Sequence, residues 1–541
     1  MKRFCVLFLA VSAALAAAAG CSSSGKPAAA APPPTPTPSV RRINPNVVEE
    51  TDTYFIERYP KKGYIRVDDR HFRHPLVGQP AEFFKEDDEY FYVKTEKVIP
   101  EEERLKRELK ERLQGKQAPP DPDRPRPQSK PTPPVADFES LTPARVAARF
   151  RLEEVANTGL PDQGLWRASF AIADMNGDGI PDIVAPPSRL AGDSKLHVWL
   201  GDGHGHFAPW KLTFIEDGKE SLDFALDYGG VAIGDVDGDG KLDVVAASHN
   251  RGLVALFGDG KGTFVVSRKG FRGTDFSTQA VALADVNGDG KLDVVADADR
   301  SEVTGLPWTR DQAQVYLSKS DRSFERKTNG IQDAAFSNSA AAWDFDGDGR
   351  VDVLFGSHYF AAVLLLFKNQ GDGTLAPVVV PDIEVWAYHF SVVPGTFGKD
   401  RAPAFADLFY KGSHESEDLR AAGVNIHVYR KGQWEKRRVW REKGTKAVLR
   451  TIAFGDLDGD GLDDVVFPDT FRGKLRIFLQ QPDGSFKEAD EKDEPKIKPV
   501  AQAVRLADLD GDGRLDVVLA KTVESSDPPD QGGWTVFLNR K

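Results

Sequence analysis

Cysteine is nearly absent from this sequence. Of the 541 residues only Cys5 and Cys21 are cysteines, so disulfides cannot cross-link the rest of the chain, and an extracellular fold would need another kind of cross-link. Basic residues are outnumbered too, because 71 Lys and Arg stand against 83 Asp and Glu, for a formal net charge of −12. This balance offers phosphates no net attraction, which argues against nucleic acid as a partner and favours cations.

Common catalytic motifs are also lacking. The sequence contains no His-Glu-x-x-His, Gly-x-Ser-x-Gly or phosphate-loop pattern, so it assigns no catalytic residue. Glycine and proline are abundant, with 49 and 36 residues, and both favour turns and linkers over long helices. Because 541 residues exceed what one core usually supports, we expect a large all-β domain joined to smaller segments by linkers.

The first twenty residues have the pattern of a secretory signal (1–20). Lys2 and Arg3 precede an apolar run that is too short to span a membrane. The sequence Ala-Ala-Gly-Cys at 18–21 resembles the lipobox of bacterial lipoproteins, although Ala18 replaces the usual Leu. The resemblance implies that Cys21 is lipidated and that the exported chain is anchored to the bacterial outer membrane or cell surface. The alternative is cleavage after an Ala-x-Ala triplet, which leaves Cys21 as a free thiol.

Three segments of different composition follow the signal. Residues 21–43 carry the lipidated cysteine and a Ser, Ala, Pro and Thr tether. Residues 44–115 combine short β-like runs with a helix expected from Pro100 to about Gly115, and they predict a small α+β module or a partly disordered arm that folds on a partner. Residues 116–136 are rich in proline and predict a stiff linker.

A repeat of roughly 50 to 61 residues fills residues 137–541. Its most regular part is an acidic loop between two apolar strands, and these loops begin at Asp174, Asp235, Asp285, Asp344, Asp456 and Asp508. One interval, from 344 to 456, is twice as long as the others, so it contains a further unit. In that unit the loop around residues 395–403 has lost all its acidic positions.

Each unit continues with a second apolar hairpin, as at 199–207, 256–264 and 478–486. Four short antiparallel strands per repeat are typical of a β-propeller blade. The last unit ends at 534–538 without a fourth strand, whereas residues 146–155 precede the first unit and belong to none. We therefore predict an all-β, seven-bladed propeller whose ring is closed by a strand donated from 146–155.

The six acidic loops share a pattern of oxygen-bearing residues. Positions 1, 3, 5 and 9 are Asp or Asn, position 7 can offer a backbone carbonyl, and Gly at positions 4 and 6 lets the backbone fold tightly. Ca²⁺ takes six to eight oxygen ligands from such groups. The candidate ligands are Asp174, Asn176, Asp178, Ile180 and Asp182; Asp235, Asp237, Asp239, Lys241 and Asp243; Asp285, Asn287, Asp289, Lys291 and Asp293; Asp344, Asp346, Asp348, Arg350 and Asp352; Asp456, Asp458, Asp460, Leu462 and Asp464; and Asp508, Asp510, Asp512, Arg514 and Asp516.

The alternative to a metal site is plain turn chemistry, which also favours Asp and Gly. Turn chemistry alone predicts scattered acidic residues, but here the same four positions are filled in six loops and lost together in the seventh. Crowded carboxylates are unfavourable without a cation, so we predict about six Ca²⁺ ions. An EF-hand is excluded because its position 12 must be Glu, and here that position is Ala, Phe or Leu within an apolar run.

This spacing resembles the FG-GAP/VCBS repeats of integrin α-subunit propellers and of many bacterial surface proteins. The resemblance covers about residues 143–541. It implies a propeller with calcium in the loops between the first and second strands of its blades, and it says little about the ligand.

In a blade with strands A to D, the A–B and C–D turns lie at one end and the B–C and D–A connections at the other. The calcium loops occupy the first end, and the second carries the long, irregular connections in which binding residues collect. Each aromatic or basic residue there is either a ligand-binding residue or an ordinary surface residue. The candidates are His249, Trp308, Arg310, His358, Tyr359, Trp386 and Arg472.

These observations predict a calcium-stabilised envelope or surface lipoprotein that acts as a binding or adhesion scaffold for a protein or polysaccharide. One alternative is a structural subunit of an envelope complex. Another is a calcium-dependent polysaccharide lyase, hydrolase or phosphodiesterase, in which His249 and His358 would be the acid and base. Because both histidines occupy the same blade position, repetition explains them more simply, and we expect a binding protein rather than an enzyme.

Overall fold

The computed structural model consists of strands and loops throughout the residues that it describes. These are the strands between 47 and 96, and residues 139–540 with gaps at 165, 167–169, 189–192, 222–223, 250, 273–276, 301–312, 328–338, 357–364, 385–386, 412–420, 445–448, 470, 498–500 and 522–532. Within this part there is no helix, and therefore none that could cross a membrane. The signal, Cys21, the tether, the helix expected after Pro100 and the linker 116–136 lie outside the described residues.

The N-terminal strands form two small sheets. One has the order β1-β2-β7-β6 and the other the order β3-β4-β5. Their bounds are β1 (Val47–Glu50), β2 (Tyr54–Pro60), β3 (Ile65–Arg66), β4 (His71–Arg73), β5 (Ala81–Glu82), β6 (Lys85–Glu86) and β7 (Tyr90–Glu96).

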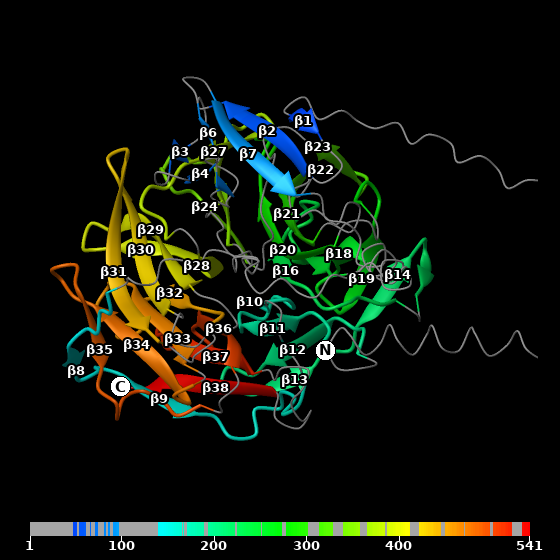
Figure 1. Ribbon diagram of the computed structural model, residues 1–541. Coiled ribbons are helices and arrows are strands. Elements are labelled where there is room, and N and C mark those ends of the chain that lie inside the picture. Colours follow the sequence, from blue (N-terminus) through cyan, green and yellow to red (C-terminus); the bar gives the residue numbers. More distant parts are fainter. Residues whose placement is uncertain are drawn as a thin grey trace, which may run out of the picture. The chain divides into compact units, whose positions relative to one another are not determined.

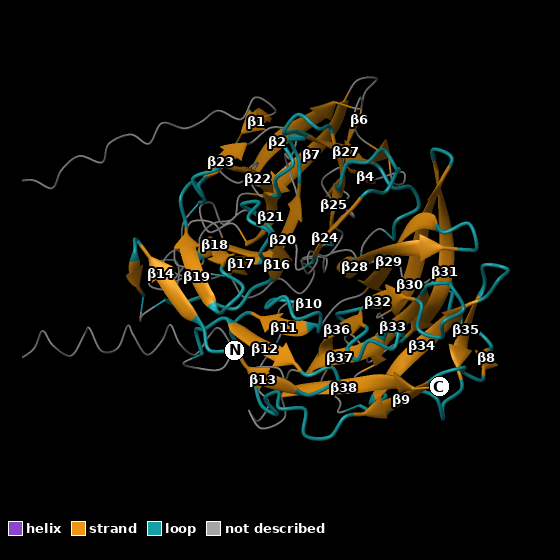
Figure 2. Ribbon diagram, turned by 180° about the vertical axis from the view of Figure 1, so that it is seen from behind, coloured by secondary structure: helices purple, strands orange, loops and turns teal. Residues whose placement is uncertain are grey.

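The remaining strands form seven blades (Figures 1 and 2). In blades 1 to 4 the strands run in sequence order from A to D. Blade 1 comprises β10 (Ala171–Ala173), β11 (Asp182–Ala185), β12 (His197–Gly201) and β13 (Phe207–Pro209). Blade 2 comprises β16 (Val231–Gly234), β17 (Asp243–Ser248), β18 (Gly252–Gly258) and β19 (Thr263–Ser267). Blade 3 comprises β20 (Ser277–Ala284), β21 (Asp293–Arg300), β22 (Ala313–Ser318) and β23 (Phe324–Lys327). Blade 4 comprises β24 (Ala340–Trp343), β25 (Asp352–Phe355), β26 (Leu365–Asn369) and β27 (Leu375–Val378).

Blades 5 and 6 follow the same order, and blade 7 has three strands of its own. Blade 5 comprises β28 (Tyr388–Phe397), β29 (Ala402–Lys411), β30 (Ala421–Arg430) and β31 (Gln433–Lys443). Blade 6 comprises β32 (Ala453–Gly455), β33 (Asp464–Asp469), β34 (Lys474–Gln480) and β35 (Phe486–Ala489). Blade 7 comprises β36 (Ala501–Ala507), β37 (Asp516–Lys521) and β38 (Gly533–Arg540).

The innermost strands of the blades make a closed circle. Each contacts the innermost strand of the next blade, in the order β10, β16, β20, β24, β28, β32 and β36, and β36 contacts β10 again. The predicted strand donation is confirmed: β9 (Arg151–Glu154) pairs antiparallel with β38, with Phe537 opposite Glu154 and Arg540 opposite Arg151. Blade 7 thereby gains a fourth strand from the N-terminal side of the ring, which covers the edge of β38.

The outer edges of two blades carry strands that the repeat pattern does not predict. β8 (Arg145–Val146) pairs parallel with β35 of blade 6. The hairpin of β14 (Thr213–Glu216) and β15 (Lys219–Glu220) extends blade 2, because β14 pairs parallel with β19. The segment before blade 1 thus contributes to two blades, first to blade 6 and then to blade 7.

Apolar side chains fill the space between neighbouring blades, and this is where the core lies. At the closure of the ring, Trp534 of β38 packs against Trp166, Phe170 and Trp199, with ring centroids 4.8–5.6 Å apart. Such aromatic contacts add to the stabilisation from buried area. The junction where the chain closes on itself therefore has a buried aromatic core.

Candidate metal centre and binding face

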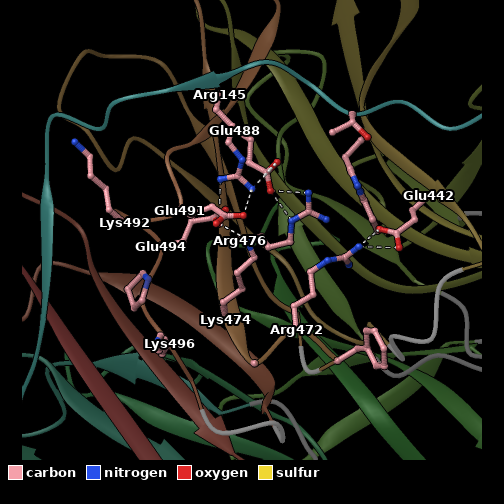
Figure 3. A pocket seen from close by; sticks show the side chains of 15 residues that line it. Arg145, Glu442, Arg472, Lys474, Arg476, Glu488, Glu491, Lys492, Glu494 and Lys496 are labelled. Carbon is pink, nitrogen blue, oxygen red and sulfur yellow. Dashed lines mark hydrogen bonds and ion pairs between the residues drawn. The ribbon is translucent and has the colours of Figure 1, made fainter.

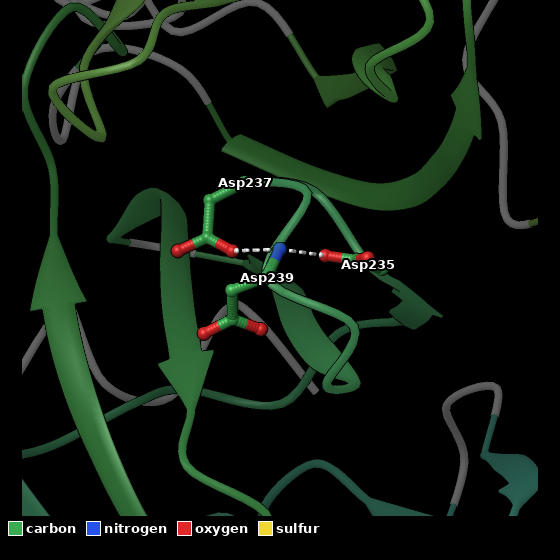
Figure 4. Close-up of side chains that lie close together, drawn as sticks. All are labelled: Asp235, Asp237 and Asp239. Atoms are coloured by element: carbon green, nitrogen blue, oxygen red, sulfur yellow. Dashed lines mark hydrogen bonds between the residues drawn. The ribbon is translucent and has the colours of Figure 1, made fainter.

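Each acidic loop is folded around the carboxylate at its first position. In the second loop Asp235 accepts backbone hydrogen bonds from Gly238 (2.8 Å), Asp239 (3.0 Å) and Gly240 (2.9 Å). Figure 4 shows the bond from Asp239, together with the side chain of Asp237. The same three bonds recur in all six loops. Both glycines have positive φ, 79° for Gly238 and 80° for Gly240, which explains why these positions are Gly.

This folding gathers the side chains of positions 1, 3 and 5. In four loops all three of these residues are Asp, and one carboxylate oxygen from each of the three lies within 4.8 Å of those of the other two. The triplets are Asp235, Asp237 and Asp239; Asp344, Asp346 and Asp348; Asp456, Asp458 and Asp460; and Asp508, Asp510 and Asp512. In the other two loops Asn176 and Asn287 stand at position 3, and each donates to the Asp at position 5, over 2.8 and 3.0 Å. The oxygen-only donor set fits Ca²⁺ better than Zn²⁺ or Cu²⁺.

Position 9 has a different environment. Asp243 is fully buried; one of its oxygens accepts the N–H of Val236 and the other that of Gly258, both over 2.8 Å. The same pair of bonds, to the second loop residue and to the end of strand C, is made by Asp182, Asp293, Asp352, Asp464 and Asp516. This Asp therefore ties the A–B loop to the C–D turn of its blade, whatever else its lone pairs bind.

Burial leaves these position-9 carboxylates hard to ionise. It raises the pKa of Asp182 to about 6 and that of Asp243 to about 7, against the opposing effect of their backbone hydrogen bonds. The charges of Asp178 and Asp174 raise the pKa of Asp182 further, and the charge of Asp237 raises that of Asp243. In the fifth loop burial and the charges of Asp460 and Asp456 also raise the pKa of Asp458. A bound dication would relieve this repulsion.

Three loops have a cationic side chain beside position 3. Arg322, from the C–D turn of blade 3, reaches across to Asp237 of blade 2 over 2.7 Å. Lys368 pairs with Asp346 and with Asp348, the latter over 2.9 Å, and Arg540 pairs with Asp510. In the second, fourth and sixth loops a side chain thus supplies part of the neutralising charge.

The opposite ends of the blades carry the predicted binding residues that the structure describes. His249, in the B–C turn of blade 2, is half-buried and stacks on Tyr228 with ring centroids 4.6 Å apart. Arg472, in the B–C turn of blade 6, pairs with Asp469 (2.8 Å) and Glu442 (2.9 Å). Trp308, Arg310, His358, Tyr359 and Trp386 lie outside the described residues. His249 belongs to blade 2 and Arg472 to blade 6, so the two do not form one cluster.

Arg472 lines a cavity of about 880 Å³ beside the B–C turn of blade 6 (Figure 3). Three segments far apart in the sequence enclose it: residues 142–145, 440–442 and 471–496. Its walls hold six cationic side chains and four carboxylates, namely Arg145, Arg472, Lys474, Arg476, Lys492 and Lys496, with Glu442, Glu488, Glu491 and Glu494. Sequence reasoning found only Arg472 of this set, because the other residues meet through contacts between distant segments.

Comparison with known protein families agrees with the repeats. A family model described as an FG-GAP-like repeat matches residues 189–246, 235–296 and 456–519, which include the second, third, fifth and sixth acidic loops. The chain is a seven-bladed β-propeller with FG-GAP-like repeats. No curated protein matches its sequence.

Solved structures similar to this propeller share little sequence with it. Crystal structures of BBS1N in complex with ARL6DN, soaked with mercury and with lead, are 11% and 10% identical, with a TM-score of 0.41 each. Each match covers 73% of this chain and 97% of that chain. The Pseudomonas aeruginosa periplasmic gluconolactonase PpgL is 13% identical, with a TM-score of 0.39, over 62% of this chain and 86% of its own.

Blade 5 of the propeller replaces the acidic loop with a tight hairpin. β28 runs to Phe397 and β29 begins at Ala402, and the N–H of Arg401 donates to the carbonyl of Gly398 over 2.9 Å. The predicted unit at 395–403 is therefore a complete blade, and its strands are 10 or 11 residues long. The loop itself is absent from this blade, which is why its four acidic positions are lost together.

A buried polar cluster in blade 5 connects its first three strands. His389 of β28 binds Asp407 of β29 over 2.7 Å, and His427 of β30 lies 3.6 Å from the other Asp407 oxygen. Burial alone would raise the pKa of Asp407, but the two histidines outweigh burial and lower it to about 2. His389 and Asp407 are fully buried and His427 is 1% exposed. These groups are closed to a substrate where they lie, and the cluster is part of the interior of the blade.

Proposed function

We propose that this propeller is a calcium-stabilised binding scaffold on the bacterial envelope or cell surface. Its ligand, a protein or a polysaccharide, would bind the blade ends opposite the calcium loops, and lipidated Cys21 would anchor the chain. The observation that carries the proposal is the convergence of three carboxylates within 4.8 Å in four separate loops. Like charges held so close repel one another, and the single Arg or Lys beside three of these loops offsets only part of their charge. A dication would offset more of it, and the donors are those that Ca²⁺ prefers.

The position of these loops supports assigning metal binding to one end of the blades and ligand binding to the other. The position-9 Asp residues connect the A–B loops to the C–D turns, and the proposed metal centres would lie at this end of the blades. The B–C and D–A connections vary in length and sequence, which leaves them free to carry binding residues. Calcium would then serve the stability of a fold that has no disulfides in this region, because Cys5 and Cys21 both precede it.

The calcium part is tested by measuring the metal content of the chain from residue 22 onward, purified in calcium and dialysed. We expect about six Ca²⁺ per chain and a large fall in melting temperature in excess EGTA. An unchanged melting curve in EGTA would contradict a stabilising role for the metal.

The binding part is tested by blocking one end of the blades at a time. The chain from residue 22 contains no cysteine, so a single introduced cysteine can be coupled to polyethylene glycol. Arg251→Cys lies in the B–C turn of blade 2, and Lys261→Cys lies in its C–D turn at the calcium end; both side chains are exposed. Binding to envelope fractions is then measured by co-sedimentation in calcium.

We expect saturable envelope binding that polymer at residue 251 weakens and polymer at residue 261 leaves intact. Loss of binding only with polymer at residue 261 would place the ligand at the calcium end. Absence of saturable binding by the unmodified chain would refute the scaffold proposal.

A further inference from the structure

We propose that the cavity beside the B–C turn of blade 6 binds an acidic oligosaccharide, a chain of sugars that carries carboxylate or sulfate groups among its hydroxyls. This inference rests on the proposed function, because it assigns a site and a ligand class to the binding end of the blades. A cavity of about 880 Å³ falls within the range usual for small-molecule sites.

The charge of the cavity is the first support. Its lining has six cationic side chains against four carboxylates, on a chain whose net charge is −12. Lys474 pairs with Glu494 over 2.6 Å, and Arg145 with Glu488 over 3.2 Å. Within the described part of the chain, Lys492 and Lys496 have no side-chain partner. These two ammonium groups are therefore available to an anionic group of a ligand.

Arg476 supplies a second, independent support. Its side chain is only 5% exposed and is held by Glu488 over 2.6 Å. Its guanidinium lies over Trp440, 4.8 Å from the ring centroid, and over Phe478 at 4.9 Å. In spite of this rigid setting, Nη1 donates no hydrogen bond and only approaches Asp469 to 4.0 Å. A buried donor without an acceptor is costly. Because Arg476 lines the cavity, a small shift of its guanidinium toward a ligand oxygen would give Nη1 the acceptor that it lacks.

Exposed apolar side chains lie in the cavity lining and next to it in the sequence. Phe471 lines it and is 60% exposed, and Leu141, which precedes the lining residue Thr142, is 38% exposed. These are two of the three large apolar side chains that are exposed in the described residues; the third is Val379. An exposed aromatic ring beside charged groups suits the flat, apolar face of a sugar ring, whose hydroxyls can bond to the Arg and Glu side chains around it.

The four carboxylates in the lining distinguish this ligand class from other anions. Glu442, Glu488, Glu491 and Glu494 would repel a ligand that is charged along its whole length, such as a nucleic acid or an acidic peptide. Sugar hydroxyls both donate and accept hydrogen bonds, so they can lie against carboxylates while the few acidic groups meet the two lysines. A mixed lining of this kind therefore favours a saccharide with occasional charges.

The test is isothermal titration calorimetry with the chain from residue 22 in calcium buffer. The probes are trigalacturonate, a sulfated carrageenan tetrasaccharide, neutral maltotriose and hexaglutamate. The variants are Lys492→Gln/Lys496→Gln and Phe471→Ala, which leave the buried Arg476 intact. The matched control is Lys219→Gln/Lys261→Gln, which removes the same charge from two exposed lysines of blade 2.

We expect at least one acidic saccharide to bind, and to bind at least 10-fold more weakly to the double lysine variant and several-fold more weakly to Phe471→Ala. The control should bind as wild type, maltotriose should bind weakly or not at all, and added salt should weaken binding. The carboxylate and sulfate probes show which acidic group the site prefers.

Equal binding by wild type and the Lys492→Gln/Lys496→Gln variant would overturn the site, and preference for maltotriose or hexaglutamate would overturn the ligand class. The scaffold proposal survives these results if envelope binding is still lost with polymer at residue 251. If the unmodified chain also fails to bind envelope fractions, both proposals fail.

Discussion

Replacing Asp243 with Ala separates the two roles that position 9 of the acidic loops could have. Its carboxylate is fully buried and accepts the N–H groups of Val236 and Gly258. If the residue mainly ties the A–B loop to the C–D turn, its loss should destabilise the blade with or without calcium. If it acts only as a metal ligand, its loss should matter only when calcium is present.

The expected size follows from the two hydrogen bonds. A buried donor left without an acceptor costs about 1–3 kcal/mol, so Asp243→Ala should lower the free energy of unfolding by roughly 2–6 kcal/mol. That is a large part of the ~5–15 kcal/mol that stabilises a typical domain. Asp237→Ala is the comparison, because its carboxylate belongs to the convergent triplet and its ion pair with Arg322 is partly exposed. Loss of such an exposed pair costs ~0–1 kcal/mol.

The assay is urea denaturation followed by tryptophan fluorescence, in calcium and in EGTA. Asp243→Ala should be less stable than wild type in both buffers. Asp237→Ala should match wild type within about 1 kcal/mol in EGTA and should lose up to ~2.7 kcal/mol relative to wild type when calcium is 100 times its Kd. If the two variants are equally stable in EGTA, the assignment of Asp243 as a structural tie is wrong.

Three further predictions follow from the fold and its charges. In EGTA the melting temperature should fall as pH rises from about 5 to 8. The native pKa of Asp182 and Asp293 is about 6 and that of Asp243 about 7, above the unfolded value of ~3.9, so the native state binds more protons than the unfolded state in this window. A melting temperature that rises through the window would contradict this. Deleting residues 139–155 removes β8 and β9 and uncovers β38, so size-exclusion chromatography should show oligomers or aggregate instead of a monomer. Asp407→Asn leaves His389 and His427 without their carboxylate and should lower the free energy of unfolding by about 3–5 kcal/mol. Denaturation at pH 7 measures this loss. A loss below about 1 kcal/mol would count against a buried ionic cluster.

The number of blades and the closure of the ring could be predicted because both depend on local spacing. The acidic loops recur at nearly constant intervals, and the doubled interval between Asp344 and Asp456 required a seventh unit without its acidic positions. The last unit lacked one strand, and residues 146–155 were one strand that belonged to no unit, so the two could be paired from the sequence. Patterns of this kind survive in the sequence because each blade repeats the same hydrogen-bonding scheme.

The added strands and the cavity could not be predicted in the same way. β14 and β8 pair parallel with the outer strands of blades 2 and 6, and no repeat position encodes them. The cavity needs Arg145, Glu442 and Arg476 to meet from three segments, and their neighbours in sequence give no sign of it. The role of the position-9 Asp was also hidden, because a carboxylate that bonds to metal and one that accepts backbone N–H groups look alike in sequence.

The pairing of β9 with β38 has a consequence for the synthesis of the chain. Arg151 meets Arg540, so the contact that completes the seventh blade joins residues almost 390 positions apart and cannot form until nearly the whole chain has left the ribosome. Contacts of such long range are slow to form, and an incomplete chain exposes an unpaired strand in the meantime. Until that last contact forms, residues 151–154 and β38 lack each other as partner strands, so a chain truncated before β38 cannot close the ring in this way.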